Sequence, residues 1–219
     1  MRGISEIMHE AEVWYNKIRG EKAAEALKKN GFDAVFFNTK EEAVPKIMEA
    51  IPKDAKVAVG GSMTIRELGI IERLAARGNR ITHHWIPGLT PDEDLRLRKE
   101  QIISDVFFSS SNAITLKGVL INTDAVGNRV CAMTFGPKKV IIIAGTNKIV
   151  DTIDDGLKRI KIVSPINNKR LALDLPCVKQ GKCVDCNEPH RSCRVTTIME
   201  RRPSKTDISI FIIGEKLGF

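Results

Sequence analysis

The amino-acid sequence predicts an α/β fold with three layers, α/β/α, in which a mostly parallel sheet is covered by helices on both faces. Short apolar runs, typical of buried strands, alternate along the chain with longer segments of helical pattern. The run KKVIIIAG at 138–145 is apolar enough to be buried on both faces, as strands of parallel sheets are. Shorter apolar runs between residues 105 and 135 are separated by turn residues, which predicts an inserted antiparallel piece.

Local signals predict where the elements begin and end. Asn30-Gly31 is a helix stop that closes the amphipathic pattern of the N-terminal segment. Thr39 and Glu42 are spaced as a capping box, and Thr90 precedes Pro91 at the first position of another helix. The expected helices span 1–30, 39–51, 65–76, 90–103 and 148–163, and the expected strands span 33–38, 55–60, 80–85, 105–111, 118–124, 129–135, 138–145 and 207–214.

Length and composition predict one domain with its own core. The chain has 219 residues, of which 42% are hydrophobic, and a chain of this size buries most of its surface on folding. We expect a single domain over 1–219, with a helical lead-in at 1–42 and a cysteine-rich loop at 176–195. The most apolar run, Val140–Ala144, is far shorter than the ~20 residues of a membrane-spanning helix. The opening stretch MRGISEIMHEAEVWYNKIRG mixes charges with apolar residues, unlike a secretory signal, so we expect a cytoplasmic protein without a membrane span.

The charge distribution favours an acidic small molecule as the partner. The net charge is +8, and Cys177–Lys205 alone carries seven Lys or Arg against three Asp or Glu. Aromatic residues make up only 5% of the chain, and they do not interleave with basic residues as they do where bases stack. Nucleic-acid binding is therefore the less favoured interpretation, and a small anionic metabolite, a carboxylate or phosphate, is the more favoured one.

The stretch VAVGGSMTIRELG at 57–69 is the first candidate binding element. Thr64 and Glu67 are spaced as a capping box, so Thr64 is expected to open the helix and to leave Ser62 free. Backbone N–H groups at such a turn are unpaired and favour an anion, and glycines let it approach closely. The alternative is a tight turn whose glycines only supply positive φ. The candidate anion-binding residues are Gly60, Gly61, Ser62 and Thr64.

Polar residues at the ends of other expected strands extend this site. Arg129, at the expected start of a strand, is a ready partner for a carboxylate or phosphate, and Asp124 could orient a ligand or transfer a proton. Turn formation alone would also explain the Asp and Asn residues near glycine, and a helix cap would explain Thr146 or Asn147. We assign catalytic roles to Asp124 and Arg129, and ligand binding also to Asn112, Asn128, Gly145, Thr146, Asn147 and Lys148.

Four closely spaced cysteines form the second candidate site: Cys177, Cys183, Cys186 and Cys193. Four thiolates suit zinc or an iron–sulfur cluster, and the surrounding cations also suit a redox-active pair. The alternative is a set of reduced thiols that pack a loop. Cys131 is expected in the core, and His83-His84, on opposite faces of a strand, receive no role.

Four stretches together resemble the LUD-domain family, the lactate-utilisation family: VGGSMTIRELG, SNAITLKGVLINTDAVGNRV, FGPKKVIIIAGTNKIV and CVKQGKCVDCNEPHRSC. The resemblance runs from about Ala43 to the C-terminus. It implies the fold shared with ribose-5-phosphate isomerase, glucosamine-6-phosphate deaminase and CoA transferases. It also implies a part in the oxidation of lactate to pyruvate, alongside iron–sulfur protein subunits.

The resemblance leaves the activity open. The isomerases have a similar phosphate-binding turn, which here would be Gly60–Thr64, whereas the glutamate nucleophile of CoA transferases has no match. No catalytic residue is carried over from the family, because shared fold does not establish a shared reaction. Two alternatives remain: a non-catalytic metal-binding or docking subunit of an iron–sulfur electron-transfer complex, and an enzyme that acts on a sugar phosphate or a CoA thioester.

Overall fold

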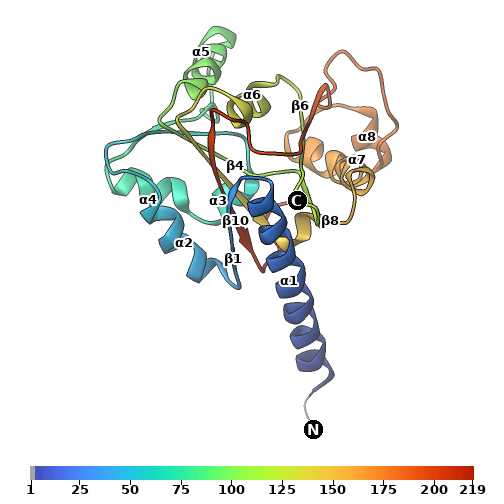
Figure 1. Ribbon diagram of the computed structural model, residues 1–219. Coiled ribbons are helices and arrows are strands. Elements are labelled where there is room, and N and C mark those ends of the chain that lie inside the picture. The colour runs from blue at the N-terminus through green and yellow to red at the C-terminus, as the bar shows by residue number, and fades with distance from the viewer. Residues whose placement is uncertain (1–2) are drawn as a thin grey trace.

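The computed structural model describes residues 3–219 (Figure 1). The helices are α1 (Ile4–Lys29), α2 (Lys40–Glu49), α3 (Met63–Glu67), α4 (Ile70–Ala76), α5 (Pro91–Ile102), α6 (Asn128–Thr134), α7 (Ile153–Arg170) and α8 (Pro176–Gln180), with a 3₁₀ turn at Thr146–Lys148. The strands are β1 (Asp33–Phe37), β2 (Lys56–Val59), β3 (Arg80–Thr82), β4 (Val106–Ser109), β5 (Ala113–Thr115), β6 (Leu120–Asp124), β7 (Lys139–Gly145), β8 (Ile149–Val150), β9 (Val195–Met199) and β10 (Asp207–Ile213).

The main sheet has six strands in the order β1-β10-β7-β4-β2-β3, and every neighbouring pair is parallel. Its central strand β7 is buried on both faces: Ile142 belongs to one apolar cluster, and Ile141 and Ile143 belong to the other. Side chains of a strand alternate between faces, so this run of isoleucines supplies both cores at once. The predicted α/β fold with a mostly parallel sheet is confirmed.

Helices cover both faces of this sheet. The apolar cluster around Val59, Ile141 and Ile143 includes residues of α2, α3 and α4, which cover one face. The cluster around Ile142 includes α1 and α6 together with strands of a second sheet, which cover the other. In Figure 1, α2 and α4 lie at the left of the body, whereas α7 and α8 lie at the right; the N-terminal half of α1 extends away from the body.

The second sheet has four strands in the order β8-β5-β6-β9. Its β5–β6 and β6–β9 pairs are antiparallel, which matches the antiparallel piece that the middle of the sequence predicts. One face packs into the cluster that contains Ile142, and the other packs on α7 through Ile121 and Ile160. Because β5 follows β4 and β8 follows β7 within a few residues, this sheet begins near the carboxyl ends of those main strands.

One predicted element is wrong, and another begins later than predicted. Residues 129–135 form most of helix α6 instead of a strand, and Cys131 is consequently exposed instead of lying in the core. The helix predicted at 148–163 begins only at Ile153, after the 3₁₀ turn and the short β8, and the Thr152 side chain caps it by accepting a hydrogen bond from Asp155 N. Within residues 3–219, no helix is long and apolar enough to cross a membrane.

Candidate functional site

A cavity of about 580 Å³ lies where the carboxyl ends of the main strands meet the second sheet and α7. The lining comes from the segments that follow β2, β3, β4 and β7, from the end of β6 and the start of α6, and from α7. Ligands of open α/β sheets bind at this edge. Of the sequence-predicted residues, Gly61, Ser62, Thr64, Asn112, Asp124, Asn128, Arg129, Lys148 and Cys193 line the cavity.

The lining carries an excess of positive charge. Its cationic side chains are Arg66, Arg98, Arg129, Lys148 and Arg170, and its only carboxylate side chain among the described residues is Asp124. Asp124 is bound by Arg129, and Arg98 pairs with Asp94. Within residues 3–219, Arg66, Arg170 and Lys148 have no ion pair to a carboxylate. The cavity is therefore suited to an anion.

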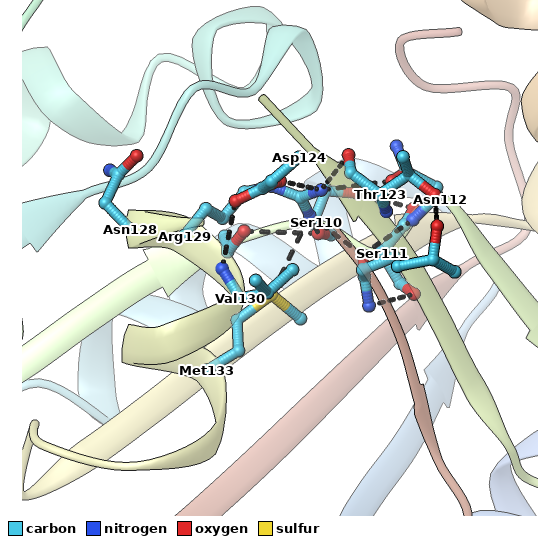
Figure 2. Close-up of polar contacts among 12 residues, drawn as sticks. Ser110, Ser111, Asn112, Thr123, Asp124, Asn128, Arg129, Val130 and Met133 are labelled. Carbon is cyan, nitrogen blue, oxygen red and sulfur yellow. Dashed lines mark hydrogen bonds and ion pairs between the residues drawn. The ribbon is translucent and has the colours of Figure 1, made fainter. Parts of the chain in front are cut away.

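Asp124 and Arg129 lie in the wall of the cavity, where hydrogen bonds to each other and to neighbouring residues occupy their polar atoms (Figure 2). Arg129 Nε donates to Asp124 Oδ1 at 2.8 Å, and the Val130 backbone N–H donates to Asp124 Oδ2 at 3.0 Å. The remaining Arg129 nitrogens donate to Ser110 O, Asn122 Oδ1, Asn112 Oδ1 and Thr123 O at 2.8–3.1 Å.

The geometry therefore favours a positioning role for Asp124 and Arg129, and their predicted catalytic roles stay predictions. A helix places Arg129 among these acceptors, whereas the sequence predicted a strand start with a free guanidinium. Together the two residues hold the ends of β4 and β6 and the start of α6 in place. Asn112 contributes to the same cluster, because its side-chain oxygen also accepts from Thr123 N at 2.8 Å.

The turn after β2 differs from its prediction in its cap. Ser62, not Thr64, caps α3: its hydroxyl accepts a hydrogen bond from Ile65 N at 3.4 Å, and Thr64, two residues further along, is fully buried. Ser62 remains half-buried at the cavity. Gly60 does not line the cavity; a Cβ there would stand 2.9 Å from the ring of Phe107 and 3.2 Å from Arg129 Cγ, so glycine is required by packing.

The turn after β7 contributes a single group to the cavity. Gly145, Thr146 and Asn147 are absent from the described lining. Thr146 N donates to Glu215 O at 3.2 Å, and Asn147 Oδ1 accepts from Leu217 N at 3.2 Å, so both residues bind the C-terminal segment. Of the four ligand-binding residues predicted in this turn, only Lys148 lines the cavity.

Lys148 is the most unusual group of the site. It is 5% exposed, and its Nζ donates to Thr64 Oγ1 and Ser110 Oγ, each at 2.8 Å. Burial, followed by the charges of Arg159 and Arg129, lowers the pKa of this amine to about 7, although Glu67 acts in the opposite direction. A buried lysine with a lowered pKa is a candidate nucleophile or base.

His84, which received no role from the sequence, also lines the cavity, and its neighbours assign its tautomer. Arg98 can only donate, and it does so to Asn128 Oδ1 at 3.1 Å. Asn128 Nδ2 then donates to Gln101 Oε1 at 3.1 Å, and Gln101 Nε2 reaches His84 Nδ1 at 3.0 Å. His84 Nδ1 is thus an acceptor and Nε2 carries the proton. Burial, and then Arg98, lower the pKa of His84 to about 4, so the ring is a neutral N–H donor near pH 7.

Sequence reasoning missed His84 because it extended the strand to residue 85, whereas β3 ends at Thr82 and the histidines lie in the loop beyond. Trp85 and Arg66 were missed as well, and their cation–π contact, 4.1 Å from Arg66 Cζ to the ring centroid, lies at the cavity. Arg66 follows the glycine turn by one helical turn, which is the signal that could have identified it.

The cysteine loop approaches the cavity through Cys193 alone among its four thiols. Cys177 is buried and accepts from Asn168 Nδ2 at 3.4 Å, whereas Cys183, Cys186 and Cys193 are partly exposed. Among residues 3–219, no group of three or more His, Cys, Asp or Glu side chains is arranged to hold a metal ion. The geometry thus gives the zinc or iron–sulfur prediction no support, and it stays a prediction.

The fold and the cavity together define an α/β protein with a cationic site at the carboxyl edge of its parallel sheet. The family model of the LUD domain matches residues 20–213. The chain belongs to the LUD-domain family, and membership makes it, at the level of the family, a lactate-utilisation-type protein.

The fold is shared with a solved structure. The crystal structure of a DUF162-family protein from Deinococcus radiodurans superposes with a TM-score of 0.50 over 90% of this chain and 98% of that chain, at 12% sequence identity. At this identity the similarity concerns the fold alone. No curated protein matches the sequence.

Proposed function

We propose that this protein binds a small metabolite with a carboxylate group in the cationic cavity, and that it serves the oxidation of lactate to pyruvate by holding the acid. The observation that carries the proposal is the charge of the lining: Arg66 and Arg170 face one cavity without a carboxylate partner among the described residues. Guanidinium groups bind carboxylates through paired hydrogen bonds.

The volume of about 580 Å³ suits a small molecule and exceeds the needs of lactate alone. A phosphate-bearing metabolite shares the anionic chemistry and is the competing ligand class. Oxidation of lactate to pyruvate releases two electrons and two protons, and we assign the electrons to an iron–sulfur protein partner. This chain's part is to bind and orient the acid.

The proposal is tested by thermal denaturation and calorimetry with lactate, pyruvate, 2-oxoglutarate and inorganic phosphate. We expect a carboxylate to raise Tm, and we expect the rise to shrink with salt because charges are screened. Arg66→Gln should weaken binding about tenfold, as expected when a hydrogen bond to a charged group is lost.

Arg201→Gln is the matched control, because it removes the same charge from an exposed position outside the cavity. Equal loss of affinity in both variants would show that the effect is one of net charge only. Binding of phosphate without any carboxylate would replace the proposed ligand class, and a Tm that no compound changes would refute the site.

A further inference from the structure

Lys148 occupies a position that anion binding alone does not require. It ends the 3₁₀ turn after the central strand β7, and its side chain runs into the wall of the cavity. Thr64 Oγ1 and Ser110 Oγ hold its Nζ at 2.8 Å from two different segments, the first turn of α3 and the end of β4. An exposed arginine would bind a carboxylate without the cost of burying an amine.

The charged groups that face this amine disfavour its protonated form. Arg129 of α6 and Arg159 of α7 are cationic, and Glu67 of α3 is the acidic neighbour. Arg159 is itself held by the Asn112 and Asn147 carbonyl oxygens, so it cannot turn away. With a pKa of about 7, about half of these amines are neutral at pH ~7, against fewer than about one in 10³ for an ordinary lysine.

A neutral amine has two N–H groups and one lone pair. The two hydroxyls of Thr64 and Ser110 match the two N–H groups, and no further hydrogen bond to Nζ exists among residues 3–219. The lone pair is thereby left for an electrophile in the cavity. Desolvation beside another cation is a known way to activate a lysine toward a carbonyl group.

We propose that Lys148 is a covalent site for a 2-oxo acid, whose keto carbon it attacks to form an imine while the cations of the lining hold the carboxylate. The inference rests on the proposed carboxylate site and names the substrate class of that same cavity. The Nζ–C2 bond forms, the C2–O bond breaks, and the oxygen leaves as water with the two protons of the amine. No electron is transferred in this step.

The hydroxyls of Thr64 and Ser110 are positioning residues for this reaction. Each contacts Nζ and lines the cavity, so each is placed to pass a proton between the amine and the departing oxygen. Ser110 also adjoins the Arg129 cluster, because its carbonyl oxygen accepts from Arg129 Nη1 at 3.0 Å. The cluster that shapes the wall therefore also places the amine.

The test is reductive trapping. The whole protein is incubated with pyruvate, glyoxylate or 2-oxoglutarate and sodium cyanoborohydride, digested, and mapped by mass spectrometry. We expect one stable secondary amine on Lys148, formed at least tenfold faster than on any other lysine. Lactate with the same reductant, which has no carbonyl group, should give no adduct.

Two variants make the outcome specific. Lys148→Arg keeps the charge and cannot form an imine, and it should lose the adduct. Lys161→Arg changes an exposed lysine of α7 outside the cavity and should keep it. Circular dichroism of each variant shows whether it is folded, and the mapping of the wild-type adduct does not depend on either variant.

Calorimetry on the same samples separates this inference from the proposed function. Binding of a 2-oxo acid without an adduct on Lys148 overturns the imine and leaves the carboxylate site intact. Adducts spread over surface lysines, unchanged in Lys148→Arg, overturn it equally. The absence of both binding and adduct overturns the two proposals together.

Discussion

Replacement of Lys148 by methionine should stabilise the protein at pH ~6. Burial lowers the pKa of the amine from its ordinary value of 10.5 to about 7, so charging it costs the folded state about 5 kcal/mol more than the unfolded chain, at ~1.4 kcal/mol per pKa unit. Methionine has a similar length and no charge to bury. It forfeits the hydrogen bonds to Thr64 and Ser110, each worth about 1 kcal/mol. The free energy of unfolding should therefore rise by about 3 kcal/mol.

The gain should depend on pH in a definite direction. Because the folded pKa of Lys148 lies below the unfolded one, the unfolded chain holds more protons between pH 7 and 10.5, and the stability of the wild type rises across this window. The variant lacks this contribution. Its advantage is full below the folded pKa, shrinks by about 1.4 kcal/mol per pH unit above it, and vanishes near pH ~9.

Urea unfolding at pH ~6 and ~9, followed by circular dichroism, measures both free energies. Lys161→Met, an exposed change on α7, should leave the stability within about 0.5 kcal/mol of the wild type at either pH. The reasoning fails if Lys148→Met is no more stable than the wild type at the lower pH. It fails also if the free energies of unfolding of variant and wild type differ by the same amount at both pH values.

Three further changes test the rest of the site. Arg129→Ala leaves a buried carboxylate unpaired and should cost about 3–5 kcal/mol in urea unfolding; a loss below about 1 kcal/mol would contradict its positioning role. Arg98→Gln removes a charge that lowers the pKa of His84, so that pKa should rise from about 4 in an NMR titration, and an unchanged value would contradict the contact. Gly118→Ala should lower the stability by more than Gly78→Ala, since both have positive φ but only Gly118 would place its Cβ against the backbone of α1, at 2.6 Å; equal Tm values would argue against that packing.

Much of the fold could be predicted because its signals are local. The isoleucines of β7 and the alternation of apolar strands with capped helices are periodic in the sequence, and Thr90 caps α5 with Pro91 at its first position, as predicted. The position of the candidate site at the carboxyl ends of the strands could be predicted for the same reason, because the end of each strand can be recognised without knowing the order of the strands in the sheet.

The errors arose where tertiary contacts outweigh local pattern. Residues 129–135 contain β-branched and aromatic side chains, as strands often do, yet they form α6 because the Asp124 carboxylate binds both Arg129 Nε and Val130 N at the start of the helix. The ion pair with Asp124 also makes the Arg129 guanidinium unavailable to a ligand. The spacing of residues in the sequence could not indicate this ion pair.

Where an element begins a few residues from its predicted position, the roles of the neighbouring residues differ from the predicted ones as well. The helix after β2 is capped by Ser62, which puts Thr64 inside the protein as a partner of Lys148. Both Thr64 and Lys148 were predicted as ligand-binding residues, but their contact joins segments 84 positions apart. The amide chain from Arg98 to His84 likewise depends on side-chain positions that only the folded structure supplies.

The most direct test of the account is an NMR titration of the protein with ¹³C-labelled lysine, followed at the Lys148 ε-carbon with and without pyruvate. The account predicts a signal that titrates at about pH 7 and is lost to a new resonance when pyruvate is added. A signal that titrates near 10.5, as for an ordinary lysine, and does not respond to pyruvate would contradict it.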